Sequence, residues 1–193
     1  DVPHVILHEL MLYVALAPLL VADLERQFLP IIACSDASIE YGFGVSVREC
    51  DLGTIRYLGS KSERHGDYIE LENPEPSDKF QRRRGCPVRL PFTLESFTDV
   101  ISIPAKQTAH SGGLEAHALL LLVQWALRAV GRFSSRLVVG IDATAVLSAA
   151  LKGRTSAPTL RRPLRSVAAH CLAGDLLLYP LWIPSRHNPA DAP

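Results

Sequence analysis

The runs Leu29-Pro-Ile-Ile-Ala-Cys-Ser-Asp36 and Arg136-Leu-Val-Val-Gly-Ile-Asp142 are apolar and strand-like, and each ends in an aspartate. A third apolar run, Leu176 to Ile183, precedes Asp191. A carboxylate just beyond a buried strand is rarely there for packing, and the ligand sites of open α/β sheets gather at the strand ends. The pattern therefore predicts an α/β fold with a polar site where its strands end.

The composition predicts one soluble, globular domain, because 48% of the 193 residues are apolar and can form a sizeable core. Acidic and basic residues balance at 20 each, so no overall basic field attracts nucleic acid. Contacts to a polyanion would have to come from local clusters. Two such clusters are present: Arg82-Arg83-Arg84, and the set Lys152, Arg154, Arg161, Arg162 and Arg165.

The four cysteines lie far apart and form no C-x-x-C pair, which argues against a zinc knuckle and against a secreted disulfide scaffold. An intracellular setting, cytoplasmic or nuclear, is the simpler expectation. The stretch from Met11 to Ala22 is too short to span a bilayer, contains Pro18 and follows no basic segment, so neither membrane insertion nor a signal peptide is expected. We expect this stretch to be a helix that packs on the core or on a partner.

The chain divides into a helical lead-in at 1–28 and a domain at 29–193. Residues 30–36, the stretch from Val45 and residues 54–58 are predicted as three consecutive antiparallel strands, with Gly42 and Gly44 in a tight connection. Residues 60–108 are charged and rich in proline, without a sustained period before 100–103. We interpret them as an insertion or a long loop.

The second half carries stronger helical signals. A helix is predicted from Leu114, with Ser111 as its N-cap and Glu115 in its first turn. The elements expected after it are a buried strand at 137–141, a helix at 143–152 ended by Gly153, a helix from Pro158 or Pro163 to Ala173, and a strand at 176–183 broken by Pro180.

Asp36, Glu115, Asp142 and Asp191 are the candidate site residues. Hydrolysis of a phosphodiester by two divalent ions needs carboxylates around metals roughly 3.5 to 4 Å apart. Mg²⁺ prefers oxygen ligands and retains several waters, so a few aspartates and glutamates suffice. Each acid also has a plainer role open to it: a turn residue for Asp36, a helix-dipole partner for Glu115, a helix cap for Asp142 and a tail residue for Asp191.

Four segments together resemble the ribonuclease H domain that follows the polymerase in retroelement reverse transcriptases, most nearly those of the DIRS and Ty3 sort. The likeness covers about residues 30–193 apart from the insertion, and the lead-in resembles the segment that joins polymerase to nuclease. The segments are Cys34-Ser-Asp-Ala-Ser-Ile-Glu-Tyr-Gly-Phe-Gly44, His110-Ser-Gly-Gly-Leu-Glu-Ala-His117, Val139-Gly-Ile-Asp-Ala143 with Leu151-Lys-Gly-Arg-Thr155, and Trp182-Ile-Pro-Ser-Arg-His-Asn-Pro-Ala-Asp-Ala-Pro193.

The resemblance implies a ribonuclease H-like α/β fold, with a mixed five-stranded sheet flanked by helices. It implies a metal-dependent endonuclease that cuts the RNA strand of RNA-DNA hybrids beside an upstream polymerase domain of the parent polyprotein. Two Mg²⁺ or Mn²⁺ ions would be held by the four acids named above. Lys152, Arg154 and His187 are the candidates for contacts to nucleic acid, with a plain surface position as the alternative for His187.

The sequence departs from the pattern of the family at three places. Ala143 replaces the usual Ser or Asn, Gly112-Gly113 precede Glu115, and the chain stops at Pro193, before the final helix expected of relatives. Because no polymerase signature such as a Tyr-x-Asp-Asp turn occurs in the sequence, we expect a fragment of a larger protein or a domesticated remnant. A catalytically inactive module that binds nucleic acid or positions a polymerase remains the alternative. A strand transferase of the integrase kind is disfavoured, because no late Glu follows Gly174.

Overall fold

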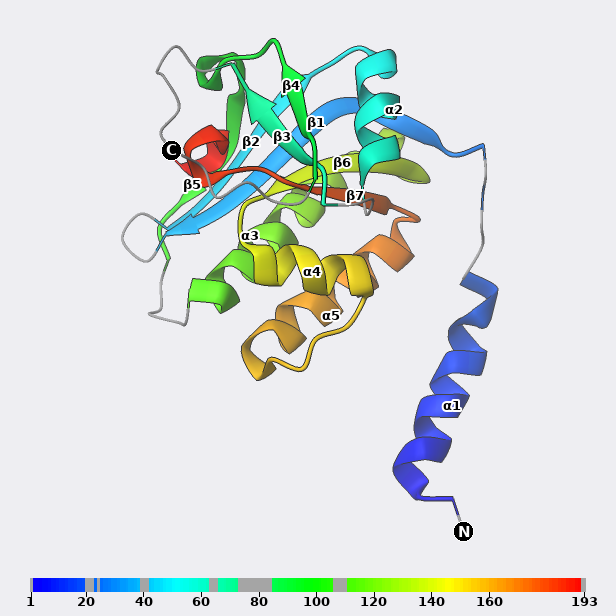
Figure 1. Ribbon diagram of the computed structural model, residues 1–193. Coiled ribbons are helices and arrows are strands. Elements are labelled where there is room, and N and C mark those ends of the chain that lie inside the picture. Colours follow the sequence, from blue (N-terminus) through cyan, green and yellow to red (C-terminus); the bar gives the residue numbers. More distant parts are fainter. Residues whose placement is uncertain are drawn as a thin grey trace.

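The computed structural model describes residues 2–19, 23, 25–38, 42–62, 66–72, 85–105 and 111–191, and they form a mixed α/β fold. One curled sheet of seven strands, in the order β4-β3-β7-β6-β1-β2-β5, runs through the domain (Figure 1). The pairs β1–β6, β6–β7 and β3–β4 are parallel, whereas β1–β2 and β2–β5 are antiparallel.

The strands are β1 (Gln27–Ser38), β2 (Gly42–Glu49), β3 (Tyr68–Leu71), β4 (Pro87–Leu90), β5 (Thr98–Ile103), β6 (Ser135–Ile141) and β7 (Leu177–Trp182). The α-helices are α1 (His4–Leu16), α2 (Leu52–Lys61), α3 (Ser111–Ala126), α4 (Thr144–Lys152) and α5 (Pro158–Ala173). Short 3-10 turns complete the described elements, among them η1 (Ala17–Leu19), η2 (Leu94–Ser96), η3 (Val130–Arg132), η4 (Ser185–His187) and η5 (Pro189–Asp191).

Both faces of the central strands are buried. Neighbouring residues of a strand point to opposite sides of the sheet, and here each side is covered by helices. Ala33 and Val139 belong to the core shared with α3, α4 and α5, whereas Ile32 and Val138 belong to the core shared with α2 (Figure 1). This two-sided burial explains why 30–36 and 137–141 read as continuous apolar runs rather than as alternating patterns. Both predicted strands are confirmed, each with a few further residues.

The sheet has seven strands rather than the expected five. The two additional strands, β3 and β4, come from the stretch 60–108 and extend the sheet beyond β7. The same stretch supplies β5, which pairs with β2 and includes the apolar residues at 100–103. Each of these strands has only four residues, of which every second one is buried: Ile69 and Leu71 in β3, Val88 and Leu90 in β4. An alternation this short is too brief to predict a strand from the sequence.

The prediction of a strand at 54–58 is wrong, because these residues lie within α2. Asp51 begins this helix as its N-cap: the carboxylate accepts hydrogen bonds from the Thr54 amide (2.9 Å) and the Thr54 hydroxyl (2.6 Å). Ile55, Leu58 and Gly59 are buried at helical spacing against the sheet. The third antiparallel strand is β5, which follows much later in the chain.

The other helices agree closely with the sequence. Gly153 ends α4 in a left-handed conformation, and α5 runs from Pro158 to Ala173 through Pro163. Pro180 does not break β7, because it pairs with Val139 on one side, while β3 pairs with β7 only at Trp182. A proline without a backbone donor is tolerated at such a partly open strand edge.

The lead-in forms α1, whose residues are all exposed, and no packing on the described core is seen for it. Packing of this helix on the core or on a partner therefore stays a prediction. Pro18 falls in η1, directly after α1. Within the described ranges, no helix is both long and apolar enough to cross a membrane.

We predict that Gly42→Ala destabilises the domain by at least about 1–3 kcal/mol. Gly42 begins β2 with a φ of +104°, and a Cβ there would lie 2.1 Å from the carbonyl oxygen of Ile103. Chemical denaturation of the two proteins measures the difference. Gly131→Ala is the matched control, because a Cβ added at that position would meet nothing within 4 Å. Equal stability of the two variants would contradict the tight β2–β5 approach.

Candidate metal centre

Parallel pairing of β1 with β6 brings two of the four acids side by side. The register aligns Cys34 with Gly140 and Ser35 with Ile141, so Asp36 and Asp142 follow at the same edge of the sheet. Gly140 allows this close pairing, because a Cβ there would lie 2.7 Å from the Cys34 sulfur. Asp36 is almost fully buried, with 5% of its surface exposed.

Helix α3 supplies the third acid. It packs on β1 and β2, and Glu115 points from it toward the end of β1. Glu115 is the fifth residue of α3 and lies beyond the first turn, which corrects its predicted position. The helix begins earlier than predicted, at Ser111. One carboxylate oxygen each of Asp36, Glu115 and Asp142 lies within 4.8 Å of the others, so the three could hold a metal ion.

The pKa values of the acidic triad are raised, as expected for buried carboxylates without a nearby positive charge. Burial raises the pKa of Glu115 to about 8, and the nearby charges of Asp36 and Asp142 contribute to this rise. Burial also raises the pKa of Asp36 to about 7, again with repulsion from Asp142. Within the described ranges, no Lys or Arg forms an ion pair with any of the three.

Asp142 is held by the end of β7 and by the segment that follows it. Ser185 donates a hydrogen bond of 2.9 Å to Asp142 Oδ2, and the Trp182 indole donates one of 2.8 Å to the Asp142 backbone oxygen. Burial raises the pKa of Asp142, and the Ser185 hydrogen bond opposes this rise. Among the described residues no donor reaches the buried Oδ1. A buried, unpaired carboxylate oxygen is costly, and a cation is the partner that would offset the cost.

Asp191 completes the set at the open side of the site. It lies at the end of η5, is exposed, and shares a small pocket of about 10 Å³ with Asp36 and Gly44. A side-chain hydrogen bond with Asp191 contributes to the raised pKa of Asp36. All four acids named from the sequence therefore lie in one place, three of them as a tight triad.

A buried amide holds the last segment of the chain onto the sheet. Asn188, 3% exposed, donates from Nδ2 to the Ser35 carbonyl oxygen (3.2 Å) and accepts from the Ala190 amide at Oδ1 (3.2 Å). The hydroxyl of Ser46, on β2, lies 3.1 Å from the Pro189 carbonyl oxygen. Asn188 thus links the residue before Asp36 to the residue before Asp191.

Sequence reasoning missed these supporting residues. Trp182, Ser185 and Asn188 stand within the quoted segment at 182–193, but only the fold reveals which backbone groups they reach. The available signal was the density of polar side chains just after an apolar strand. Nothing in the sequence marks Ser46 as a supporting residue, because it looks like an ordinary polar residue inside the strand β2.

Of the candidates for nucleic-acid contact, His187 is buried, whereas Lys152 and Arg154 are exposed. His187 is 3% exposed, and its pKa is lowered by burial and by Arg186, so the expectation of a plain surface histidine is wrong. Lys152 and Arg154 are exposed; Lys152 is the last residue of α4, a helix of nine residues, and therefore lies on the order of 12 Å from Asp142. The cluster at 82–84, like His110, falls outside the described residues.

No protein-family model matches the chain, and no curated protein or solved structure shows significant similarity to it. The geometry of the triad is accordingly the main basis for a functional assignment.

With divalent ions chelated, we predict that Glu115→Gln stabilises the protein above pH 8 by about 1–2 kcal/mol, after allowance for solvent screening. The pKa of Glu115 rises from 4.5 to about 8 on folding, so the folded state favours the protonated form. The destabilisation is absent below pH 4.5 and increases to its full value above pH 8. Thermal unfolding at pH 4 and pH 8.5 measures it. Glu49→Gln, at an exposed position on β2, serves as control, and an equal effect in both variants would contradict the prediction.

We predict that Asn188→Ala loosens the segment 188–191, at a cost of about 1–3 kcal/mol for the lost buried hydrogen bonds. Hydrogen–deuterium exchange of the Ala190 amide reports this loosening directly. Ser185→Ala is the comparison, because it removes a bond to Asp142 and leaves the bonds of Asn188 intact. Unchanged protection of the Ala190 amide in Asn188→Ala would contradict the positioning role.

Proposed function

We propose that the chain is a ribonuclease H-like endonuclease that requires Mg²⁺ or Mn²⁺ and hydrolyses the RNA strand of RNA-DNA hybrids. In this proposal it is the nuclease domain of a retroelement reverse transcriptase and works beside an upstream polymerase domain. The observation that carries the proposal is the convergence of Asp36, Glu115 and Asp142, from two strands and one helix, within 4.8 Å.

The topology supports the fold that this proposal requires. Apart from β3 and β4, the sheet has five strands in the order β5-β2-β1-β6-β7, of which β5 also comes from the stretch 60–108. This sheet is mixed and is flanked by helices on both faces. Two of the acids belong to its central pair: Asp36 lies near the end of β1, and Asp142 directly follows β6.

The chemistry of the donors fits divalent cations that prefer oxygen. The triad offers carboxylates only, one of them with an unpaired oxygen, and its raised pKa values reflect burial and repulsion that a cation would relieve. Asp36, Glu115 and Asp142, with Asp191 at the open side, would hold two ions. Bound ions of this kind activate water and stabilise the leaving oxygen of a phosphodiester.

The remaining residues hold this arrangement in place. Trp182 holds the backbone of Asp142 and Ser185 holds its Oδ2, while Oδ1 has no donor among the described residues. Asn188 keeps the segment with Asp191 on the sheet while Asp191 itself remains exposed. The site is thus rigid on its sheet side and open where a nucleic-acid strand would approach.

Contacts to the nucleic acid away from the scissile bond are assigned to Lys152 and Arg154. Both are exposed, and residues 143–174 contain no Asp or Glu. At a distance on the order of 12 Å from the triad, they are too far away to reach the phosphate held there. These cations would therefore position the duplex rather than act at the cleaved bond.

Cleavage of a labelled RNA-DNA duplex in the presence of Mg²⁺ or Mn²⁺ tests the proposal. We expect Asp36→Asn and Asp142→Asn each to lower the rate by at least about 100-fold, because even residues that only support metal ligands cost 10- to 100-fold. Glu49→Gln, which removes an exposed acid from β2, should leave the rate unchanged.

The same experiment separates the proposal from its alternative. Absence of metal-dependent cleavage by the full protein would overturn the nuclease assignment. If the protein still bound the duplex, the result would select a module that binds nucleic acid without cutting it. Cleavage that persists in Asp36→Asn would place the catalytic site elsewhere.

A further inference from the structure

We propose that the apolar groove between α4, α5 and β7 is the docking site of α1 from the same chain. This inference does not rest on the proposed nuclease function. It rests on two unpartnered surfaces of the described chain, on their opposite charges and on the point where the lead-in joins the domain.

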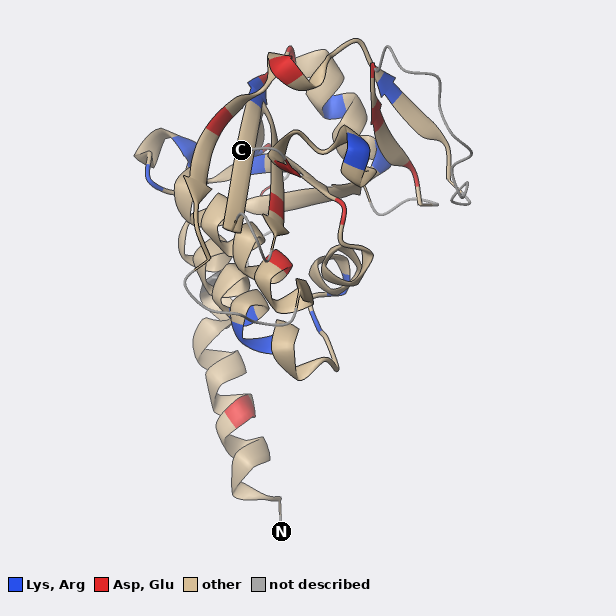
Figure 2. Ribbon diagram, turned by 90° about the vertical axis from the view of Figure 1, so that its left-hand side faces the viewer, with Lys and Arg blue, Asp and Glu red and all other residues tan. Residues whose placement is uncertain are grey.

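The first surface is α1 itself. It is apolar on every side, and its residues are exposed, for example Val5 and Met11 at 71% each. Figure 2 shows the helix almost free of charge, with one acidic position. A helix that is apolar all round is normally enclosed by other structure, so α1 requires a partner surface.

The second surface is a groove of about 630 Å³ on the helical side of the domain. Leu164, Cys171, Leu177 and Leu178 are among the apolar side chains that line it, and Leu177 is 43% exposed. Grooves of this size and apolar lining are typical binding sites for helices and other apolar ligands.

The charges around the two surfaces are complementary. The rim of the groove carries only cations, namely Lys152, Arg154, Arg161 and Arg165. Residues 2–25 contain three acids, Glu9, Asp23 and Glu25, and no Lys or Arg. An apolar helix flanked by acids is the kind of partner that an apolar groove with a basic rim selects.

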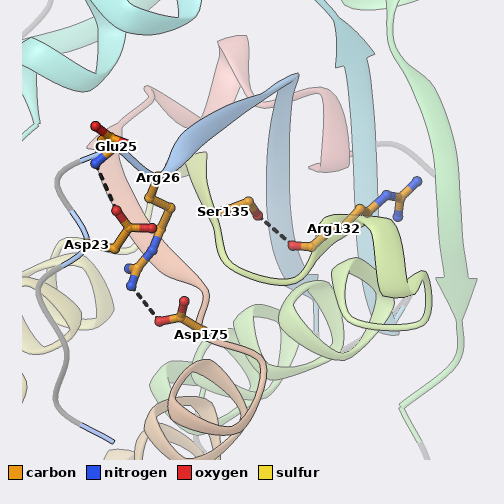
Figure 3. Close-up of polar contacts among 6 residues, drawn as sticks. All are labelled: Asp23, Glu25, Arg26, Arg132, Ser135 and Asp175. Carbon is orange, nitrogen blue, oxygen red and sulfur yellow. Dashed lines mark hydrogen bonds and ion pairs between the residues drawn. The ribbon is translucent and has the colours of Figure 1, made fainter.

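The lead-in joins the domain beside the groove. Arg26, directly before β1, forms an ion pair of 2.5 Å with Asp175 (Figure 3). Asp175 is followed by Leu176 and Leu177, which line the groove. Residues 20–25 can span about 20 Å at roughly 3.3–3.6 Å per residue, so α1 is tethered within reach of the groove. Such a tether gives the helix a high effective concentration there.

Cross-linking in the full chain tests the proposal. Met11→Cys is combined with Leu177→Cys in a Cys86→Ser background and treated with a short bismaleimide. Cys86 is the exposed native thiol, and Cys34 is fully buried; Cys50 and Cys171 are only partly buried, and Cys171 lines the groove, so these two are replaced by alanine as well. The control pair is Met11→Cys with Leu94→Cys, since Leu94 is similarly exposed and lies outside the groove, in η2.

We expect an intrachain cross-link that forms several-fold faster in the Leu177 pair than in the Leu94 pair. Reversal of the rim charge by Arg161→Glu with Arg165→Glu should slow it. A cross-link between two chains would overturn the proposal in favour of α1 docking onto a second copy. Equal rates for the two pairs would also overturn it, because α1 would then have no preference for the groove.

Discussion

The parallel pairing of β1 with β6 is the constraint on which the rest of the structure depends. It requires a glycine at 140, because the Cys34 sulfur occupies the space of a Cβ there. The pairing buries apolar residues on both faces of the sheet and at the same time sets Asp36 and Asp142 next to each other. The stability of the core thus supports an arrangement of like charges that the site alone could not maintain.

The supporting structure of the site comes from the end of the chain. Trp182 and Ser185 orient Asp142, and Asn188 fastens the final turn onto the backbone of β1. The bond from Ser185 satisfies one oxygen of the Asp142 carboxylate, and the other has no donor among the described residues. The side chains of Trp182, Ser185 and Asn188 are hydrogen-bonded, whereas this carboxylate oxygen has no such partner in the described part of the chain. Such an arrangement is typical of a site that can accept a cation.

Charge is distributed unevenly in a chain whose net charge is zero. Asp36, Glu115 and Asp142 meet near the ends of β1 and β6, while residues 143–174 carry five Lys and Arg and no acid. The helical layer is therefore basic on a neutral protein, and local clusters of this kind govern contacts with polyanions or with acidic partners. Bound nucleic acid and a docked α1 would draw on the same cations.

The sequence alone determined the central strands, the helices α3, α4 and α5, and the identity of the four acids, because long apolar runs and glycine stops are local signals. It failed at α2, where Asp51 is as typical of a turn as of a helix cap, and at β3 and β4, which are too short to show a period. Tertiary structure alone decided the strand register, the start of α3 relative to Glu115 and the contacts of Ser46 and Asn188. These depend on pairings between residues far apart in the chain, and no local pattern in a single sequence records such pairings.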